Sequence, residues 1–208
     1  LNGDAEAGTI YKIETSGSDF QTIYDFKSFS GKSSRCQLLL ADNNKFYGTA
    51  QGIMDYSYCG IIYEYDPQTN HYRVVYDFYL QDDTYEYDVN ECSLIQASTG
   101  KIYGITYNGG SNNHGTLFEY NPLTDAMDIK VNFYAITKGH RPLGKLCEAS
   151  DGKLYGITQS GGAHSSGVLY QYDPDTETFG LVREFNGSNM GKNERDRKVV
   201  PPATALAL

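Results

Sequence analysis

Tryptophan and positive charge are scarce in this chain of 208 residues. The sequence has no tryptophan, and its 17 lysines and arginines are outnumbered by 26 aspartates and glutamates, so the formal net charge is −9. Nucleic acids and anionic membrane surfaces bind mainly through phosphates and need a basic protein face. We therefore expect no nucleic acid as a partner. The acidity instead favours neutral, cationic or metal-bridged ligands.

Long apolar runs and known catalytic motifs are also missing. No stretch approaches the roughly 20 apolar residues that a spanning helix requires, so we expect no membrane insertion. The sequence has no Gly-x-Ser-x-Gly, His-Glu-x-x-His or Cys-x-x-Cys motif. Its Gly-Gly pairs, at 109–110 and 161–162, precede predicted strands and offer no helix N-terminus to a phosphate. These absences favour a protein that is not an enzyme.

Aromatic residues are abundant, with 19 tyrosines and nine phenylalanines, and they recur at nearly fixed intervals. Successive copies lie 52 to 56 residues apart, at Tyr47, Tyr103 and Tyr155, at Tyr11, Tyr63, Phe118 and Tyr170, and at Phe26, Phe78, Phe133 and Phe185. The runs around them are short, β-branched or aromatic, and bounded by turn residues. A period near 50 residues built of short strands is the signature of a β-propeller blade.

The fold class we predict is therefore an all-β propeller with four antiparallel strands in each blade. Residues 1–190 form the repeats, about 3.5 to 4 blades, and 191–208 form a linker or an edge-strand tail. The predicted units are a half blade at 8–26 and full blades at 36–79, 92–134 and 145–186. Because the half blade lacks two strands, we expect a segment of a larger propeller; a four-bladed ring closed imperfectly and a ring closed by another chain are the alternatives.

The connections between the predicted strands differ in how much their lengths vary. The third-strand aromatic residue and the fourth-strand phenylalanine are always 15 residues apart, whereas the distance from that phenylalanine to the next first strand varies from 15 to 19. Alternate connections of an up-and-down sheet leave from opposite ends, so the variable loops gather on one face, where repeat proteins usually bind. These loops are 27–35, 51–59, 79–91, 107–114, 135–144 and 159–166.

A glycine follows the tyrosine of each predicted second strand, at Gly48, Gly104 and Gly156. We expect a neighbouring sheet or the central channel to come close at these positions. The other recurring positions are aromatic, aliphatic or turn residues. They bring no chemistry of their own.

Two segments of the repeat carry a family resemblance. The Gly-Thr-Ile-Tyr-Lys-Ile run at 8–13, with its Ser-Gly-Ser-Asp turn and the Tyr-Asp-Phe that follows, and the Lys-Phe-Tyr-Gly-Thr run at 45–49 resemble the GloVer-type tandem repeat of bacterial exported and surface-anchored proteins. The layout is also similar to kelch blades. The resemblance implies an extracellular or cell-surface β-propeller and supplies no catalytic residue.

Tyrosines without counterparts in the other copies make the variable face a candidate ligand platform. A tyrosine offers a flat apolar ring and a hydroxyl together, which suits a sugar ring or a peptide. The alternative is that these rings only cover the ends of the blade core. The residues are Tyr56, Tyr58, Tyr85, Tyr87 and Tyr107.

Charged residues and histidines of the same loops are further candidates. Arg35 and Arg141 are candidate ligand-binding residues. Oxygen ligands at Asp82, Asp83 and Glu86 would suit calcium, but their spacing matches no EF-hand, and a solvated acidic loop is the simpler account. Three histidines in loops of adjacent blades would suit zinc, without a motif to support it, and are otherwise ligand-binding candidates: His114, His140 and His164.

The four cysteines leave several arrangements open. A disulfide between Cys59 and Cys92, or between Cys36 and Cys59, is feasible on the variable face. Cys147 falls within a predicted strand and is most simply a small buried apolar residue.

We therefore expect a secreted or surface-displayed binding or scaffold module that holds a glycan or a protein on its variable face, with no cofactor other than calcium. A carbohydrate-active hydrolase or lyase that uses acids of the same face is the alternative, and a structural spacer or adhesin segment is a second one.

Overall fold

The computed structural model describes residues 8–27, 34, 36–51, 60–78, 88–89 and 92–187, which form fifteen strands in four sheets. No helix of these residues has the length and apolar character to cross a membrane. The architecture is all-β, as the sequence predicts.

One two-stranded sheet and three larger ones follow the order of the repeats. The half-blade consists of β1 (Thr9–Lys12) and β2 (Gln21–Asp25). Blade 1 contains β3 (Leu39–Leu40), β4 (Phe46–Gln51), β5 (Gly60–Asp66) and β6 (His71–Asp77). Blade 2 contains β8 (Ile95–Gln96), β9 (Ile102–Thr106), β10 (Thr116–Asn121) and β11 (Ala126–Asn132). Blade 3 contains β12 (His140–Glu148), β13 (Leu154–Ser160), β14 (Val168–Asp173) and β15 (Thr178–Glu184).

The inner strands of blades 2 and 3 are linked in a way that the repeat pattern does not predict. The short strand β7 (Cys92–Ser93) precedes β8 in the second copy but pairs with β12 of the third, in parallel, through Gly144 and Lys145. All other strand pairs of the four sheets are antiparallel.

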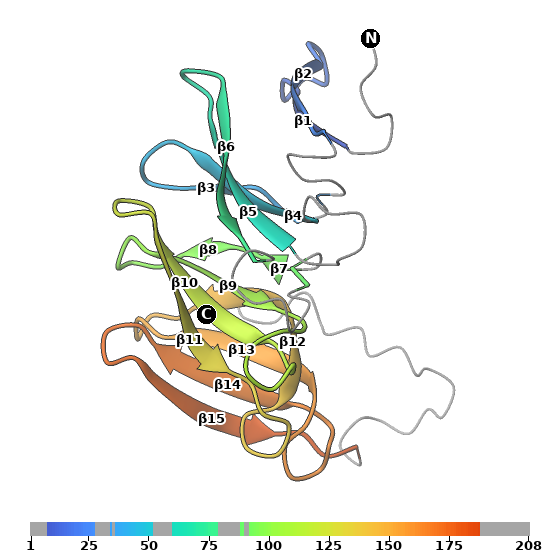
Figure 1. Ribbon diagram of the computed structural model, residues 1–208, viewed down its shortest axis with the longest axis vertical. Helices are drawn as coiled ribbons and strands as arrows, with labels where there is room; N and C mark the ends of the chain where they lie inside the picture. Colours follow the sequence, from blue (N-terminus) through green and yellow to red (C-terminus); the bar gives the residue numbers. More distant parts are fainter. Residues whose placement is uncertain are drawn as a thin grey trace.

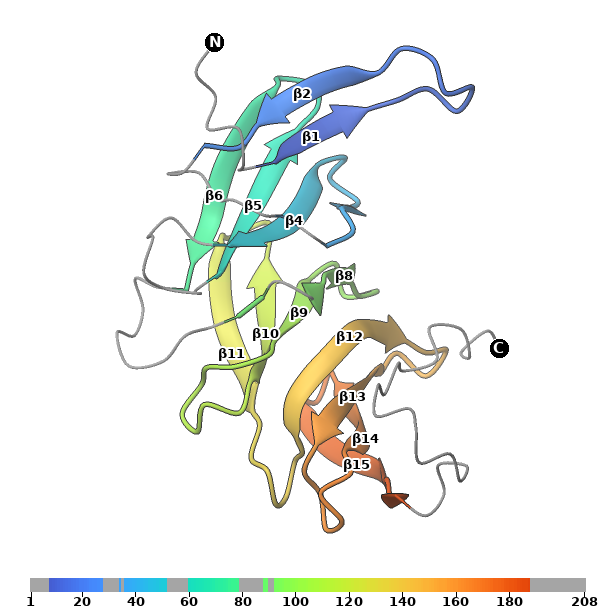
Figure 2. The ribbon, with the colours of Figure 1, turned by 90° about the vertical axis from the view of Figure 1, so that its right-hand side faces the viewer.

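The sheets follow one another along the long axis of the molecule, with the half-blade at one end and β15 at the other (Figures 1 and 2). The described residues therefore form an arc and not a closed ring. Apolar side chains fill the spaces between successive sheets in three clusters, one at each boundary. In β5, the first six residues are all buried, as expected for a strand covered on both faces.

The recurring glycines make room for a ring of their own blade. Gly104 lies directly opposite Phe118 in the β9–β10 pair, and a Cβ atom at Gly104 would collide with the Phe118 ring. The same holds for Gly48 with Tyr63 and for Gly156 with Tyr170. The expected approach of a neighbouring sheet or a channel is thus wrong, because the third-strand aromatic ring folds back over the second strand.

Cys147 is also placed differently from the prediction. It is a free thiol that is only partly buried, and its Sγ lies 3.6 Å from the carbonyl oxygen of Glu148. The preceding residue, Leu146, is the buried one, with 1% of its surface exposed. Because successive side chains of a strand point to opposite faces, the predicted core register of this strand is off by one residue.

Candidate ligand-binding site

The connections of each blade leave from two opposite ends of its sheet. In blade 1 the strand ends Gln51, Gly60 and Asp77 lie together, since Gln51 is opposite Gly60 and the N–H of Phe78 donates to the carbonyl oxygen of Gly60. The loops at 51–59 and 79–91 thus start from one end. We call this end of the sheets the variable-loop face and the opposite end the hairpin-turn face.

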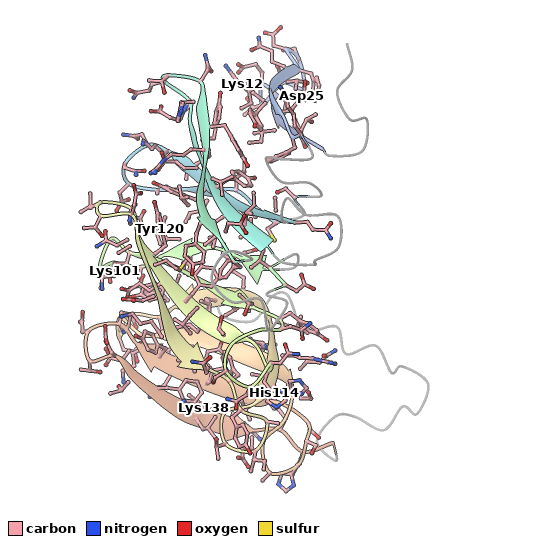
Figure 3. All side chains as sticks on the ribbon, viewed as in Figure 1. Lys12, Asp25, Lys101, His114, Tyr120 and Lys138 are labelled. Carbon is pink, nitrogen blue, oxygen red and sulfur yellow. The ribbon has the colours of Figure 1, made fainter. Side chains whose placement is uncertain are left out.

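Figure 3 shows both faces, with His114 on the variable-loop side and Lys101 and Tyr120 on the hairpin-turn side. Most of the predicted site residues of the variable-loop face lie outside the described residues: Arg35, Tyr56, Tyr58, Cys59, Asp82, Asp83, Tyr85, Glu86 and Tyr87. For Cys92 only the backbone, in β7, is described. The remaining candidates belong to blades 2 and 3.

Tyr107 and Arg141 form the centre of a cluster between these two blades. The Arg141 guanidinium carbon lies over the Tyr107 ring, 5.2 Å from its centroid. The Tyr107 hydroxyl donates to Oε1 of Gln159 at 2.8 Å, and its backbone N–H donates to the carbonyl oxygen of Asp88. Arg141 therefore covers one face of the Tyr107 ring. Arg141 is exposed whereas Tyr107 is partly buried, so on this side a ligand meets the guanidinium and not the bare ring.

The backbone of Arg141 is held in an unusual conformation. Its φ is 58°, in the left-handed region that residues other than glycine seldom adopt. The N–H of Arg141 donates to the carbonyl oxygen of His114 at 2.9 Å, which joins the first residues of β12 to the loop 107–115. Strained residues of this kind gather at functional sites.

Two of the three candidate histidines meet in this cluster. The rings of His114 and His140 lie edge to face with centroids 4.2 Å apart. Nδ1 of His140 is 3.3 Å from the Ser160 hydroxyl, and Nδ1 of His114 is buried without a hydrogen-bond partner among the described residues. We call Tyr107, His114, His140, Arg141 and Gln159 the rim cluster.

The three-histidine zinc site is not formed. His164 is exposed in its own loop, and its carbonyl oxygen accepts a hydrogen bond from the Ser166 hydroxyl. No group of three histidine, cysteine or acidic residues is arranged to hold a metal ion anywhere in the described part of the chain.

The electrostatics of the rim cluster keep His140 neutral. Burial lowers the pKa of His140 below its ordinary value of 6.5, and the nearby His114 and Arg141 lower it further. At neutral pH the imidazole is therefore a hydrogen-bonding group without charge, and Arg141 carries the positive charge of the cluster.

Acidic side chains are absent from the three described loops of this region. The segments 107–115, 134–141 and 159–167 contain no aspartate or glutamate, but they contain Lys138, Arg141 and three histidines. The net charge of −9 is thus a poor guide to this part of the surface. Nearby charges act most strongly on a bound group, and the charged side chains of these three segments are all basic.

The hairpin-turn face holds a second group of charged residues that the sequence analysis missed. Glu64 is buried in blade 1, where it accepts hydrogen bonds from Tyr47 at 2.7 Å, Lys45 at 2.7 Å and Arg73 at 3.0 Å. Burial alone would raise the pKa of Glu64, but the three donors outweigh it and lower the pKa to about 2. Recurring positions therefore do carry charge chemistry, contrary to our expectation.

Blade 2 repeats this arrangement. Glu119 accepts hydrogen bonds from the Tyr103 hydroxyl and from Lys101 at 2.8 Å. Lysine two residues before the second-strand tyrosine and an acid directly after the third-strand aromatic residue are the sequence signal that could have revealed both sites. Every polar atom of these groups is engaged with a protein partner, so we assign them a structural role.

Charged residues also connect neighbouring blades on this face. Arg73 of blade 1 donates to Asp125 of blade 2 at 2.9 and 3.0 Å, and Lys130 of blade 2 pairs with Glu177 of blade 3 at 2.6 Å. Asp125 and Glu177 hold the same position of the β10–β11 and β14–β15 turns, each with positive φ. The turn thus points a carboxylate toward the preceding blade.

The fold is shared with solved β-propeller structures. The chain is similar to TolB from Acinetobacter baumannii, with 16% identity, a TM-score of 0.52, and coverage of 84% of this chain and 37% of TolB. It is similar to the extracellular domain of a hybrid two-component system from B. thetaiotaomicron, with 15% identity, a TM-score of 0.57 and coverage of 88% and 21%. The corresponding values for a chain of the nidogen/laminin complex are 10%, 0.54, 86% and 56%. This chain thus spans about a fifth to just over half of these structures.

These likenesses and the four sheets define the protein as a repeat-built β-propeller, which confirms the predicted fold class. The model of the Gloeobacter/Verrucomicrobia repeat matches residues 1–200, and the chain belongs to this family, as its resemblance to the GloVer-type repeat implies. No curated protein matches the chain.

Proposed function

We propose that this chain is an extracellular or surface-displayed binding module, without catalytic activity, that holds its ligand on the variable-loop face. The rim cluster is the observation that supports this proposal. It brings a guanidinium, a tyrosine, an amide and two imidazoles together from loops and strand ends of two blades, on the face whose loop lengths vary. Such convergence of planar and polar side chains is typical of ligand sites on repeat proteins.

The ligand class that suits the rim cluster best is a sugar that bears a carboxylate, such as a uronic acid unit of a polysaccharide. Arg141 offers the forked donor set that binds a carboxylate through two hydrogen bonds. Gln159 and the histidines offer partners for sugar hydroxyls, and the stacked Tyr107 holds the guanidinium plane in place. The three loops bring no acidic side chain of their own to the anion.

An exported location follows as part of the same proposal. The repeat resembles that of bacterial exported and surface-anchored proteins, and acidic polysaccharides are abundant outside cells. The composition, rich in tyrosine and poor in lysine and arginine, supports the same location.

Calorimetric titration with short uronic acid oligosaccharides tests the proposal. We expect saturable binding by the parent protein. The affinity should be at least tenfold lower for the Arg141→Gln variant, and also at least tenfold lower when the parent protein is titrated with the matched neutral oligosaccharide, because either change removes the charge-assisted pair. Lys12→Gln is the control, since Lys12 is an exposed cation at the end of β1 that leads into the β1–β2 turn, on the hairpin-turn side, and its loss leaves binding unchanged.

Three other outcomes of the titration would contradict the proposal. Equal binding of the neutral oligosaccharide would remove the carboxylate requirement. Binding of acidic peptides in preference to every sugar would make the ligand a protein. Shortening of the oligosaccharide during the titration would favour a hydrolase or lyase.

A further inference from the structure

The half-blade contains a strand that is paired on only one edge within the described part of the chain. β1 is the third strand of its copy, the counterpart of β5, β10 and β14. Each of those three pairs with the second strand of its blade on one edge and with the fourth strand on the other. Among the described strands β1 pairs only with β2, its fourth strand.

The exposure of Tyr11 in β1 also differs from that of its counterparts in the full blades. Tyr11 is 57% exposed, whereas its counterparts Tyr63, Phe118 and Tyr170 are 1%, 0% and 0% exposed. In the full blades the second strand passes over this ring with its glycine. Tyr11 instead stacks on Phe20, itself 61% exposed, with ring centroids 5.2 Å apart. An apolar surface that every other copy buries is thus open here.

The half-blade is nevertheless held in the geometry of a blade. Phe26 is buried and meets the Tyr63 ring of blade 1 at a centroid distance of 5.3 Å, and Tyr24 stacks on Tyr72 at 4.0 Å. The open edge is therefore attached to a rigid support. A strand that adds to it does not need to order β1 first.

We propose that the open edge of β1 binds one antiparallel β-strand of the same repeat type, with an apolar-Tyr-Gly pattern and its glycine opposite Tyr11. This register repeats Gly48 with Tyr63, Gly104 with Phe118, and Gly156 with Tyr170. Backbone hydrogen bonds along the edge supply the affinity, and the glycine supplies the specificity, since a larger residue collides with the ring.

The occupant is a repeat strand from outside the three full copies. The Tyr-Gly pair occurs three times in the sequence, in β4, β9 and β13, and each of these strands is already paired on both edges. A second folded copy of this chain has no free strand of this kind to offer within its described residues. A first-and-second-strand hairpin of another repeat does.

The charge of Lys12 refines the sequence of this strand. Lys12 stands where blades 1 and 2 have Glu64 and Glu119, which pair with Lys45 and Lys101 of their second strands at 2.7 and 2.8 Å. In the half-blade the sign is reversed. We infer that the incoming strand carries an acidic residue two positions before its tyrosine, because like charges across a strand pair are destabilising.

A peptide of residues 94–108, the first-and-second-strand hairpin of blade 2, is the probe. With Lys101→Glu in the peptide we expect saturable binding to the intact chain, about threefold to fivefold tighter than that of the unchanged peptide. The order reverses on Lys12→Glu in the protein, a change at an exposed side chain. Hydrogen exchange of the β1 amides slows when the peptide binds.

The glycine gives the control. A peptide that carries Gly104→Val together with Lys101→Glu is expected not to bind. Attachment of the Lys101→Glu hairpin ahead of residue 8 through a Gly/Ser linker provides a second readout, because tethering raises the effective concentration and should raise Tm. Equal binding of the valine peptide, or neither binding nor a rise in Tm with the Lys101→Glu hairpin, overturns the proposal.

Discussion

The ring of Phe78 in blade 1 meets the ring of Phe118 in blade 2 edge-on, with centroids 5.4 Å apart and planes inclined by 62°. The same contact joins a fourth-strand phenylalanine to the third-strand aromatic residue of the next blade at both other boundaries, at 5.3 and 5.1 Å, between Phe26 and Tyr63 and between Phe133 and Tyr170. These six rings are almost completely buried. The recurring pair therefore fixes the spacing of the blades, and it explains why the repeat keeps an aromatic residue at both positions.

Removal of one ring of this pair is the first test of that role. Phe78→Ala should lower the free energy of unfolding by about 3–5 kcal/mol, because it leaves a cavity at the boundary of blades 1 and 2. Denaturant titration measures this directly. Phe20→Ala, at a ring that is 61% exposed, is the matched control and should cost about 1 kcal/mol at most. Equal losses in both variants would show that the boundary does not depend on the ring.

Tyr120 and Tyr172 are buried at equivalent positions of blades 2 and 3 and differ in the partner of their hydroxyl group. The Tyr120 hydroxyl donates to Asp125 at 2.6 Å, whereas the Tyr172 hydroxyl is buried without a partner among the described residues. The turn residue Glu177 is engaged with Lys130 instead. Tyr120→Phe should therefore cost about 1–2 kcal/mol, and Tyr172→Phe should be neutral or slightly stabilising. A reversal of this order in thermal unfolding would contradict the assigned hydrogen bonds.

The close approach at the second-strand glycine predicts sensitivity to a single methyl group. Gly104→Ala places a Cβ against the Phe118 ring and should destabilise the fold by about 1–3 kcal/mol. Gly180→Ala is the control, since that glycine also lies in a strand and its nearest neighbour is the flexible side chain of Gln171, 3.3 Å away. It should change stability by about 0.5 kcal/mol or less. Tolerance of the Gly104 change would mean that the ring is free to move.

Acid should weaken the hairpin-turn face. The pKa of Glu64 is about 2 in the folded protein, below its ordinary 4.5, so its ion pairs stabilise the fold above pH 4.5. This contribution is lost as the pH falls from about 4.5 toward 2. Asp125, whose pKa Arg73 and Tyr120 also lower to about 2, adds to the same loss.

Thermal unfolding between pH 7 and pH 2 measures this dependence. Glu64→Gln should lower Tm at pH 7 and flatten the fall of Tm between pH 4.5 and 2. Asp128→Asn, at an exposed side chain 3.6 Å from Lys130, is the control and should keep the slope of the parent protein. An unchanged slope in Glu64→Gln would show that other groups govern acid unfolding.

The fold was predictable because each blade repeats a local pattern. The 15-residue spacing from Tyr63 to Phe78 corresponds to the β5–β6 hairpin. These two rings recur in each copy because each of them contacts a ring of a neighbouring blade. The parallel pairing of β7 with β12 was not predictable, since it joins two copies through only two residues on each strand. The burial of Cys147 was misjudged because it aligns with the apolar residues Leu39 and Ile95. The charged residues Lys145 and Glu148 stand on either side of the pair Leu146 and Cys147, so alternation did not show which of the two is buried.

The candidate site was only partly predictable. Loop lengths indicated its face, and Tyr107, Arg141, His114 and His140 were all candidates. Their contacts were not, because the stacking of Arg141 on Tyr107 depends on a positive φ that the sequence of a residue before proline does not indicate. Gln159 was missed for a similar reason, since an isolated polar residue at a strand end carries no pattern.

The central claim, that the ligand binds at the rim cluster, is tested most directly by NMR titration of the labelled protein with a uronic acid oligosaccharide. We predict that the largest shifts fall on the side chain of Arg141 and on the imidazole signals of His114 and His140. Shifts confined to Lys45 and Arg73 on the hairpin-turn face, or none at saturating oligosaccharide, would contradict the account.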